Sequence, residues 1–194
     1  MVDEAADDRP AASGGGVPRP PPGRIGRSSD VERVTRALDD ERLVTVLGPS
    51  GVGKTRLAVE VAAGARERFD DVWVCGLTAV HDADSMVADI SRTVGVHRDE
   101  DPDALDAVIS ALDGRRSLLV LDHLDQVAGA AAGVVARLLA SARGLSLLVT
   151  SSLELGIGDE VALDLAQLDE RDAARLLRGL GDAAADERDD ERDG

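Results

Sequence analysis

Apolar residues along the chain gather in five short runs, which are separated by longer stretches with helical spacing. The runs are predicted to be strands, and they cover residues 43–47, 71–77, 117–121, 145–150 and, more weakly, 161–165. The three strongest are almost continuous in apolar residues, which is typical of strands covered on both faces. Helices are predicted over residues 54–68, 83–95, 102–112, 127–143 and 169–179. Strands that alternate with helices in this way predict a parallel sheet with helices on both faces.

Two of the predicted helices have a recognisable start. Ahead of the first strand, Ser29 and Glu32 have the spacing of a capping box. The apolar residues that follow share one helical face, and they are Val31, Val34 and Leu38. For the helix over 102–112, Asp101 is the predicted cap and Pro102 the first helical residue.

The two ends of the chain differ in composition from its middle. Residues 1–23 are rich in glycine and proline and lack hydrophobic periodicity, so we expect a disordered leader. Residues 182–194 hold seven acids and two arginines with no large apolar residue, so we expect a disordered acidic tail. The folded domain is therefore expected over residues 24–168.

A glycine-rich motif lies between the first strand and the helix that follows it. Residues 48–55, GPSGVGKT, match the phosphate-binding pattern G-x-x-x-x-G-K-[ST] in full. The glycines let backbone N–H groups converge on phosphate oxygens, Lys54 would reach the β- and γ-phosphates, and Thr55 would coordinate Mg²⁺. A plain glycine turn with a surface lysine is disfavoured, because Lys54 is the only lysine of the chain. The predicted nucleotide-binding residues here are Gly48, Pro49, Ser50, Gly51, Val52, Gly53, Lys54, Thr55 and Arg56.

Two acids follow the third predicted strand. Asp122 lies at its carboxyl end, where open parallel sheets bind ligands, and its carboxylate can hold Mg²⁺ as in a Walker B motif. The alternative is a helix-capping aspartate. Asp125 could orient and deprotonate an attacking water, or it could be a surface acid; the sequence leaves both roles open. The candidate catalytic residues are Asp122, Asp125 and Lys54, and the candidate metal ligands are Thr55 and Asp122.

Composition narrows the classes of ligand and partner. The formal net charge is −16 and aromatic residues make up 1% of the chain, which disfavours direct nucleic-acid binding. With one lysine, no NKxD guanine motif can occur, so ATP or ADP with Mg²⁺ is the expected cofactor set. The lone Cys75 allows no internal disulfide, and no apolar stretch of 18 residues occurs, so no membrane contact and a cytoplasmic location are expected. Cys75 is predicted to be a small buried apolar residue.

A complete strand-and-helix segment, residues 71–112, separates the phosphate motif from Asp122. This insertion predicts an α/β fold of the additional-strand class of P-loop NTPases, with a parallel five-stranded sheet between helices. That class differs from the nucleotide kinases and GTPases.

Residues 24–178 resemble the NB-ARC-type ATPase module of STAND regulators, especially large LuxR-type and antibiotic-regulatory transcription factors. The resemblance implies that Gly26 and Arg27, in RIGRSSDVERV, border the adenine pocket. It also implies that LDERDAARLLRGL is the first helix of an incomplete lid over residues 169–181. The chain departs from the family at Ser152, where an arginine that reads the γ-phosphate usually follows Thr-Ser.

The resemblance favours an ATP- and Mg²⁺-binding regulatory switch module with slow ATP hydrolysis. Its partners would be the nucleotide and either a partner protein or additional domains. Two alternatives remain open at this point. One is a non-hydrolysing nucleotide-binding interaction module, and the other is an oligomeric ATPase similar to AAA+ proteins.

Overall fold

The computed structural model describes residues 17–18, 27–96 and 104–167. Its helices are α1 (Ser28–Asp40), α2 (Lys54–Gly64), α3 (Ala83–Val94), α4 (Ala104–Leu112) and α5 (Ala128–Ser141), with short 3₁₀ turns η1 (Ala65–Glu67) and η2 (Leu124–Gln126). Its strands are β1 (Leu43–Leu47), β2 (Asp71–Gly76), β3 (Ser117–Asp122), β4 (Leu145–Ser151) and β5 (Glu160–Asp164). The predicted helix over 169–179, the acidic tail and the leader apart from residues 17–18 lie outside the described residues.

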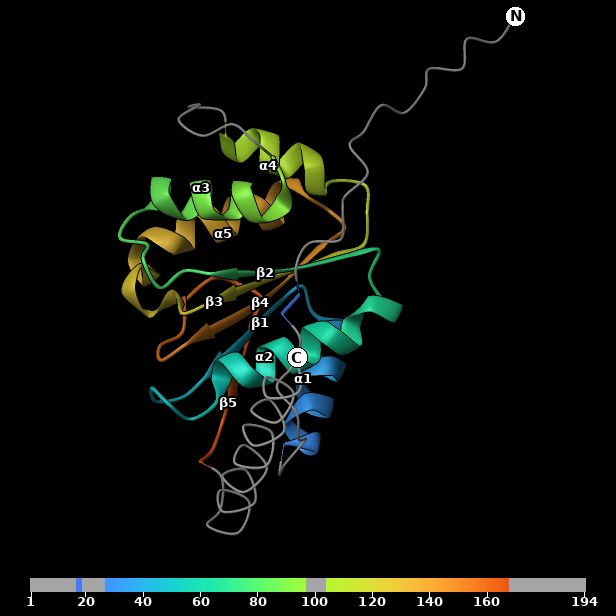
Figure 1. The fold of residues 1–194 in the computed structure, drawn as a ribbon, viewed down its shortest axis with the longest axis vertical. Helices are drawn as coiled ribbons and strands as arrows, with labels where there is room; N and C mark the ends of the chain where they lie inside the picture. Colours follow the sequence, from blue (N-terminus) through green and yellow to red (C-terminus); the bar gives the residue numbers. More distant parts are fainter. Residues whose placement is uncertain (1–16, 19–26, 97–103, 168–194) are drawn as a thin grey trace, which may run out of the picture.

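The five strands form one parallel sheet in the order β2-β3-β4-β1-β5. Helices α1 and α2 cover one face, and α3, α4 and α5 cover the other, which gives three layers (Figure 1). The predicted α/β architecture is confirmed. Strand β1, which precedes the phosphate motif, and strand β3, which ends at Asp122, are separated by β4. The inserted segment, residues 71–112, supplies β2 at the edge of the sheet. Because all the strands are parallel, their carboxyl ends meet at one edge of the sheet.

Each face of the sheet has its own apolar core, because side chains alternate along a strand. On β1, Val44 and Val46 pack with α1 and α2, while Leu43 packs with the core under α3, α4 and α5. Every residue of β3 is buried, as its almost continuous apolar sequence predicted. Cys75 is also buried, as predicted, and burial raises the pKa of its thiol to about 11. The thiol is therefore protonated at neutral pH.

The predicted strands agree with the observed ones to within one residue at each end. Helix ends agree less well, since the helix predicted over 54–68 ends at Gly64 and continues as a 3₁₀ turn. Asp101 and Pro102, the predicted start of the helix over 102–112, lie outside the described residues. None of the helices in the described ranges has the length and apolar character that a membrane span requires.

The capping box predicted at Ser29 and Glu32 is wrong. Helix α1 begins at Ser28, its cap position is Arg27, and no side chain makes a capping hydrogen bond there. Ser29 therefore lies inside the first turn, where its hydroxyl cannot accept from the N–H groups of later residues in the capping geometry. The helix itself was predicted, but its cap was placed at Ser29, two residues after the observed cap Arg27.

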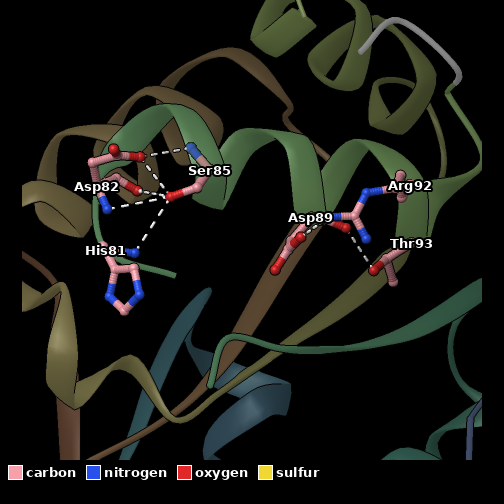
Figure 2. Close-up of polar contacts among 6 residues, drawn as sticks. All are labelled: His81, Asp82, Ser85, Asp89, Arg92 and Thr93. Carbon is pink, nitrogen blue, oxygen red and sulfur yellow. Dashed lines mark hydrogen bonds and ion pairs between the residues drawn. The ribbon is translucent and has the colours of Figure 1, made fainter. Parts of the chain in front are cut away.

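A capping box does occur at the start of α3, which Figure 2 shows. The Ser85 N–H donates to Asp82 Oδ1 over 2.8 Å, and the Asp82 N–H donates to Ser85 Oγ over 3.3 Å. Hydrogen bonds from the Ser85 side chain and backbone lower the pKa of Asp82. Further along the same helix, the Thr93 hydroxyl donates to the Asp89 carbonyl and Arg92 pairs with the Asp89 carboxylate. The start of α3 is thereby fixed beside the carboxyl edge of the sheet, where β2 ends.

Thr45 is a polar residue in the middle of β1 that is fully buried. Within the described part of the chain, its hydroxyl has no hydrogen-bond partner. Because a buried hydroxyl without a partner costs free energy, we expect Thr45→Val to raise the free energy of unfolding by about 1 kcal/mol. Urea denaturation measures the change. Thr45→Ala is the control and should lower stability, because it leaves a cavity; a valine variant less stable than wild type would show that the hydroxyl has a partner.

Candidate functional site

The phosphate loop, residues 48–55, connects the carboxyl end of β1 to the first turn of α2. Gly53 is the cap residue of α2 and has φ 102°, a left-handed conformation that glycine adopts without a steric penalty. A Cβ on Gly48 would lie 2.9 Å from Val52 Cγ1 and 3.2 Å from the Leu165 carbonyl oxygen. The loop is therefore curled tightly against its own Val52 and against the end of β5, and a glycine is needed at both positions.

Lys54 lies inside this curl and is only 8% exposed. Its Nζ donates to the Gly48 carbonyl over 2.7 Å and to the Pro49 carbonyl over 3.2 Å. These two bonds hold the ammonium group within the loop, which leads directly into the first turn of α2. Positive charge and a helix N-terminus therefore coincide at one place, which is the arrangement that binds phosphate groups.

Asp122 is the last residue of β3 and is 5% exposed. Its Oδ1 accepts hydrogen bonds from the Thr55 hydroxyl over 3.0 Å and from the Thr150 hydroxyl over 2.5 Å. The two predicted metal ligands, Thr55 and Asp122, are thus brought together from α2 and β3. Sequence reasoning missed Thr150, which lies near the end of β4, because its proximity depends on β4 lying between β1 and β3.

His123 follows Asp122 and adopts a left-handed backbone conformation with φ 66°. Its Nδ1 lies 2.8 Å from Asp122 Oδ2, and its backbone N–H donates to Thr150 Oγ1 over 3.0 Å. Both oxygens of Asp122 therefore have polar neighbours, which fixes the plane of the carboxylate. His123 was not among the predicted site residues, and the structure places it beside this carboxylate.

Asp125 lies on the turn after β3, at the same edge of the sheet. Its Oδ1 accepts from the Ser152 backbone N–H, and the Ser151 hydroxyl lies 3.5 Å away. Burial acts to raise the pKa of Asp125, but hydrogen bonds from Ser152 and the charge of Lys54 outweigh it and lower that pKa. Asp125 is therefore a carboxylate at neutral pH, tied to the end of β4 and within the field of Lys54.

Arg27, at the start of α1, contacts its own helix and two other segments of the chain. Its guanidinium donates to Asp30 Oδ2 over 3.0 Å, to the Val52 carbonyl over 2.8 Å and to the Ala166 carbonyl over 2.7 Å. The predicted binding residue Arg27 is thus placed against the phosphate loop, while Gly26 lies outside the described residues. Of the other predicted residues, Pro49, Ser50 and Gly51 are exposed in the loop, and Arg56 is half-buried in the first turn of α2.

The donor set at this edge suits Mg²⁺. A hydroxyl and a carboxylate are hard oxygen ligands, and P-loop NTPases hold Mg²⁺ with one of each, the rest of the shell being phosphate oxygens and water. The described residues contain no group of three or more His, Cys, Asp or Glu side chains that could hold a metal ion by themselves. Thr55 and Asp122 therefore fit a metal that arrives with a phosphate ligand.

Comparisons with known proteins agree with the resemblance to NB-ARC modules that the sequence indicated. The NB-ARC domain matches residues 27–162. An uncharacterised protein of Mycobacterium tuberculosis is 34% identical over 138 residues, which cover 71% of this chain and 35% of that protein. The regulatory protein AfsR of Streptomyces griseus is 36% identical over 119 residues, which cover 57% of this chain and 12% of AfsR. The chain thus spans about a third of the first relative and much less of AfsR.

The fold also matches a solved structure. The crystal structure of Cdc6p from Pyrobaculum aerophilum aligns with a TM-score of 0.67 at 14% identity, over 86% of this chain and 52% of that chain. At this identity the likeness concerns the fold alone. The phosphate loop, the paired Thr55 and Asp122, and the domain match over residues 27–162 lead to one conclusion: the chain belongs to the NB-ARC family of P-loop NTPases.

Proposed function

We propose that this chain is an ATP- and Mg²⁺-binding switch module of a larger regulator, with slow ATP hydrolysis. One observation carries the proposal: Lys54 is held inside the curled phosphate loop, at the same sheet edge as the hydrogen-bonded pair Thr55 and Asp122. A cation, converging backbone amides and a metal-ligand pair are the parts that nucleotide phosphates need. The relatives are longer than this chain, which supports a role as one module among several.

Different residues would bind the phosphates and the metal ion. The amides of residues 48–55 and the Lys54 ammonium would bind phosphate oxygens, while Thr55 and Asp122 would hold Mg²⁺. The metal, when bound, neutralises charge on the phosphates. We propose adenine as the base, because the single lysine excludes an NKxD guanine motif and Arg27 lies beside the loop at Val52. Direct nucleic-acid binding is not part of the proposal, since the net charge is −16.

Slow hydrolysis is proposed because one charged contact is missing. At Ser152 the family usually has an arginine, and here the backbone N–H of Ser152 donates to Asp125 instead. A charge-assisted hydrogen bond contributes about 1.5–3 kcal/mol, so its loss weakens discrimination between ATP and ADP. The same feature favours the second candidate function, a nucleotide-binding interaction module that does not hydrolyse ATP.

The domain organisation follows from the same proposal. Residues 24–168 would form the ATPase domain, and residues 169–181 would supply the first helix of a lid. Partner surfaces or further domains would contact this domain. ATP would then stabilise one arrangement of these parts, and its hydrolysis would release that arrangement.

Calorimetry tests nucleotide binding directly. We expect titration of ATP with Mg²⁺ into the full chain to give saturable heat, with ADP binding within about tenfold of ATP because the γ-phosphate contact of an arginine is missing. GTP serves as the control and should bind more weakly. A folded protein that produces no heat with ATP or ADP would contradict the proposal.

Asp125→Asn separates the two candidate functions. If Asp125 orients and deprotonates water, phosphate release should fall by about 10²–10⁴-fold, the usual contribution of a general base. ATP affinity should change little, because Asn can still accept from the Ser152 N–H. Glu154→Gln, an exposed acid in the segment after β4, is the matched control. Nucleotide binding without phosphate release, in wild type and in Asp125→Asn alike, would favour the interaction module.

A further inference from the structure

Arg27 connects the phosphate loop to the chain that leaves β5. The side chain is 11% exposed, and its guanidinium reaches Val52 of the loop and Ala166, two residues beyond the end of β5. Both acceptors are backbone carbonyl oxygens, at 2.8 Å and 2.7 Å. The contact therefore depends on the position of the backbone in both segments and not on the identity of their side chains.

Two other contacts fasten the same segments. The Leu165 N–H donates to the Leu47 carbonyl over 2.8 Å, immediately before the phosphate loop. Gly48 lies so close to Leu165 that an added Cβ would be 3.2 Å from the Leu165 carbonyl oxygen. The loop and residues 165–166 are thus packed together, and Arg27 bridges them from outside.

Asp30 fixes the orientation of this bridge. Its Oδ2 accepts from Arg27 over 3.0 Å, while its Oδ1 accepts from Arg33 over 3.1 Å. Arg33 is about half exposed. Among the described residues, Asp30 is the partner that the structure gives for its side chain. Arg33 therefore pairs with Asp30 as Arg27 does, but it does not link the phosphate loop to Ala166, so Arg33 is a matched control.

We propose that Arg27 is a positioning residue that couples the phosphate loop to the segment leaving β5. The inference rests on the proposed nucleotide binding. When phosphates occupy the loop, the Val52 peptide is held, and the planar guanidinium transfers that order to Ala166. A lysine cannot replace it, because a single ammonium group lacks the rigid fork that reaches carbonyls in two segments. Phosphate binding in the loop thereby affects the position of the segment that follows residue 166 in a longer regulator.

Hydrogen exchange measured by mass spectrometry tests the coupling. The full chain is measured free and with ADP or ATP plus Mg²⁺, at concentrations that saturate each variant, so that differences in affinity do not enter. In wild type, nucleotide should slow exchange both in residues 48–57 and in residues 160–167, the latter by roughly tenfold. In Arg27→Lys, residues 48–57 should stay protected while residues 160–167 respond less than about twofold.

The controls separate this idea from the proposed function. Arg33→Ala should respond as wild type does. If Arg27→Lys does not fold or bind, Asp30→Ala, which removes the anchor but leaves Arg27, should reduce the response of residues 160–167. Nucleotide that protects neither segment in wild type would contradict the proposed function itself. An undiminished response of residues 160–167 in Arg27→Lys, or in Asp30→Ala where Arg27→Lys does not fold or bind, while the loop is protected, would overturn the coupling alone.

Discussion

Lys54→Ala is expected to weaken ATP binding by about a hundredfold or more. The ammonium is the only lysine charge of the chain and lies within the curl of the phosphate loop, held by the Gly48 and Pro49 carbonyls. Charge-assisted hydrogen bonds contribute about 1.5–3 kcal/mol each, and about 1.4 kcal/mol corresponds to a tenfold change in affinity. Calorimetric titration of ATP with Mg²⁺ measures the loss.

Arg92→Ala is the control for charge. It changes the net charge by the same amount, but Arg92 is 60% exposed on α3 and pairs locally with Asp89. Its ATP affinity should equal that of wild type. Circular dichroism and thermal denaturation should show that Lys54→Ala is folded, since the two carbonyls that lose their donor lie at the loop and not in the sheet. Equal affinity of wild type and Lys54→Ala would contradict the assignment of the loop.

The sheet could be predicted from the sequence because its strands are buried on both faces. An almost continuous apolar run such as 117–121 is typical of a strand that is covered on both faces, and the observed β3 differs from it by one residue. Helix ends are less certain because solvent satisfies their backbone groups. At α1 the capping box failed since several polar residues precede the helix, and a side-chain spacing alone does not say which of them enters the first turn.

The candidate site was predictable only in part. The phosphate motif names its residues by their order along the chain, and Asp122 follows a strand, so both have a local signal. Thr150 and Ala166 have none, because they reach the site only through the strand order β3-β4-β1-β5. Two of the contacts of Arg27, with Val52 and with Ala166, likewise join segments far apart in sequence. The parts of the site that depend on which strands are neighbours required the structure.

Asp122→Asn is expected to reduce ATP hydrolysis by about 10²–10³-fold, comparable to removing one group that stabilises transition-state charge. The neutral amide is a poorer ligand for Mg²⁺ than a carboxylate, so the metal dependence of ATP binding should weaken. The fold should be kept, because an amide oxygen can accept from Thr55 and Thr150 as Asp122 Oδ1 does. Phosphate release and ATP affinity with and without Mg²⁺ measure both effects.

Thr150→Val separates the effect of the charge of the Asp122 carboxylate from the effect of its orientation. The valine removes the hydroxyl that donates to Asp122 and accepts from the His123 N–H, while the charge stays in place. If orientation alone governs the site, Thr150→Val should resemble Asp122→Asn; if the charge dominates, its effect should be about tenfold smaller. We expect the second result, because Thr55 still donates to the same oxygen. Hydrolysis by Asp122→Asn at the wild-type rate would show that Asp122 does not hold the metal.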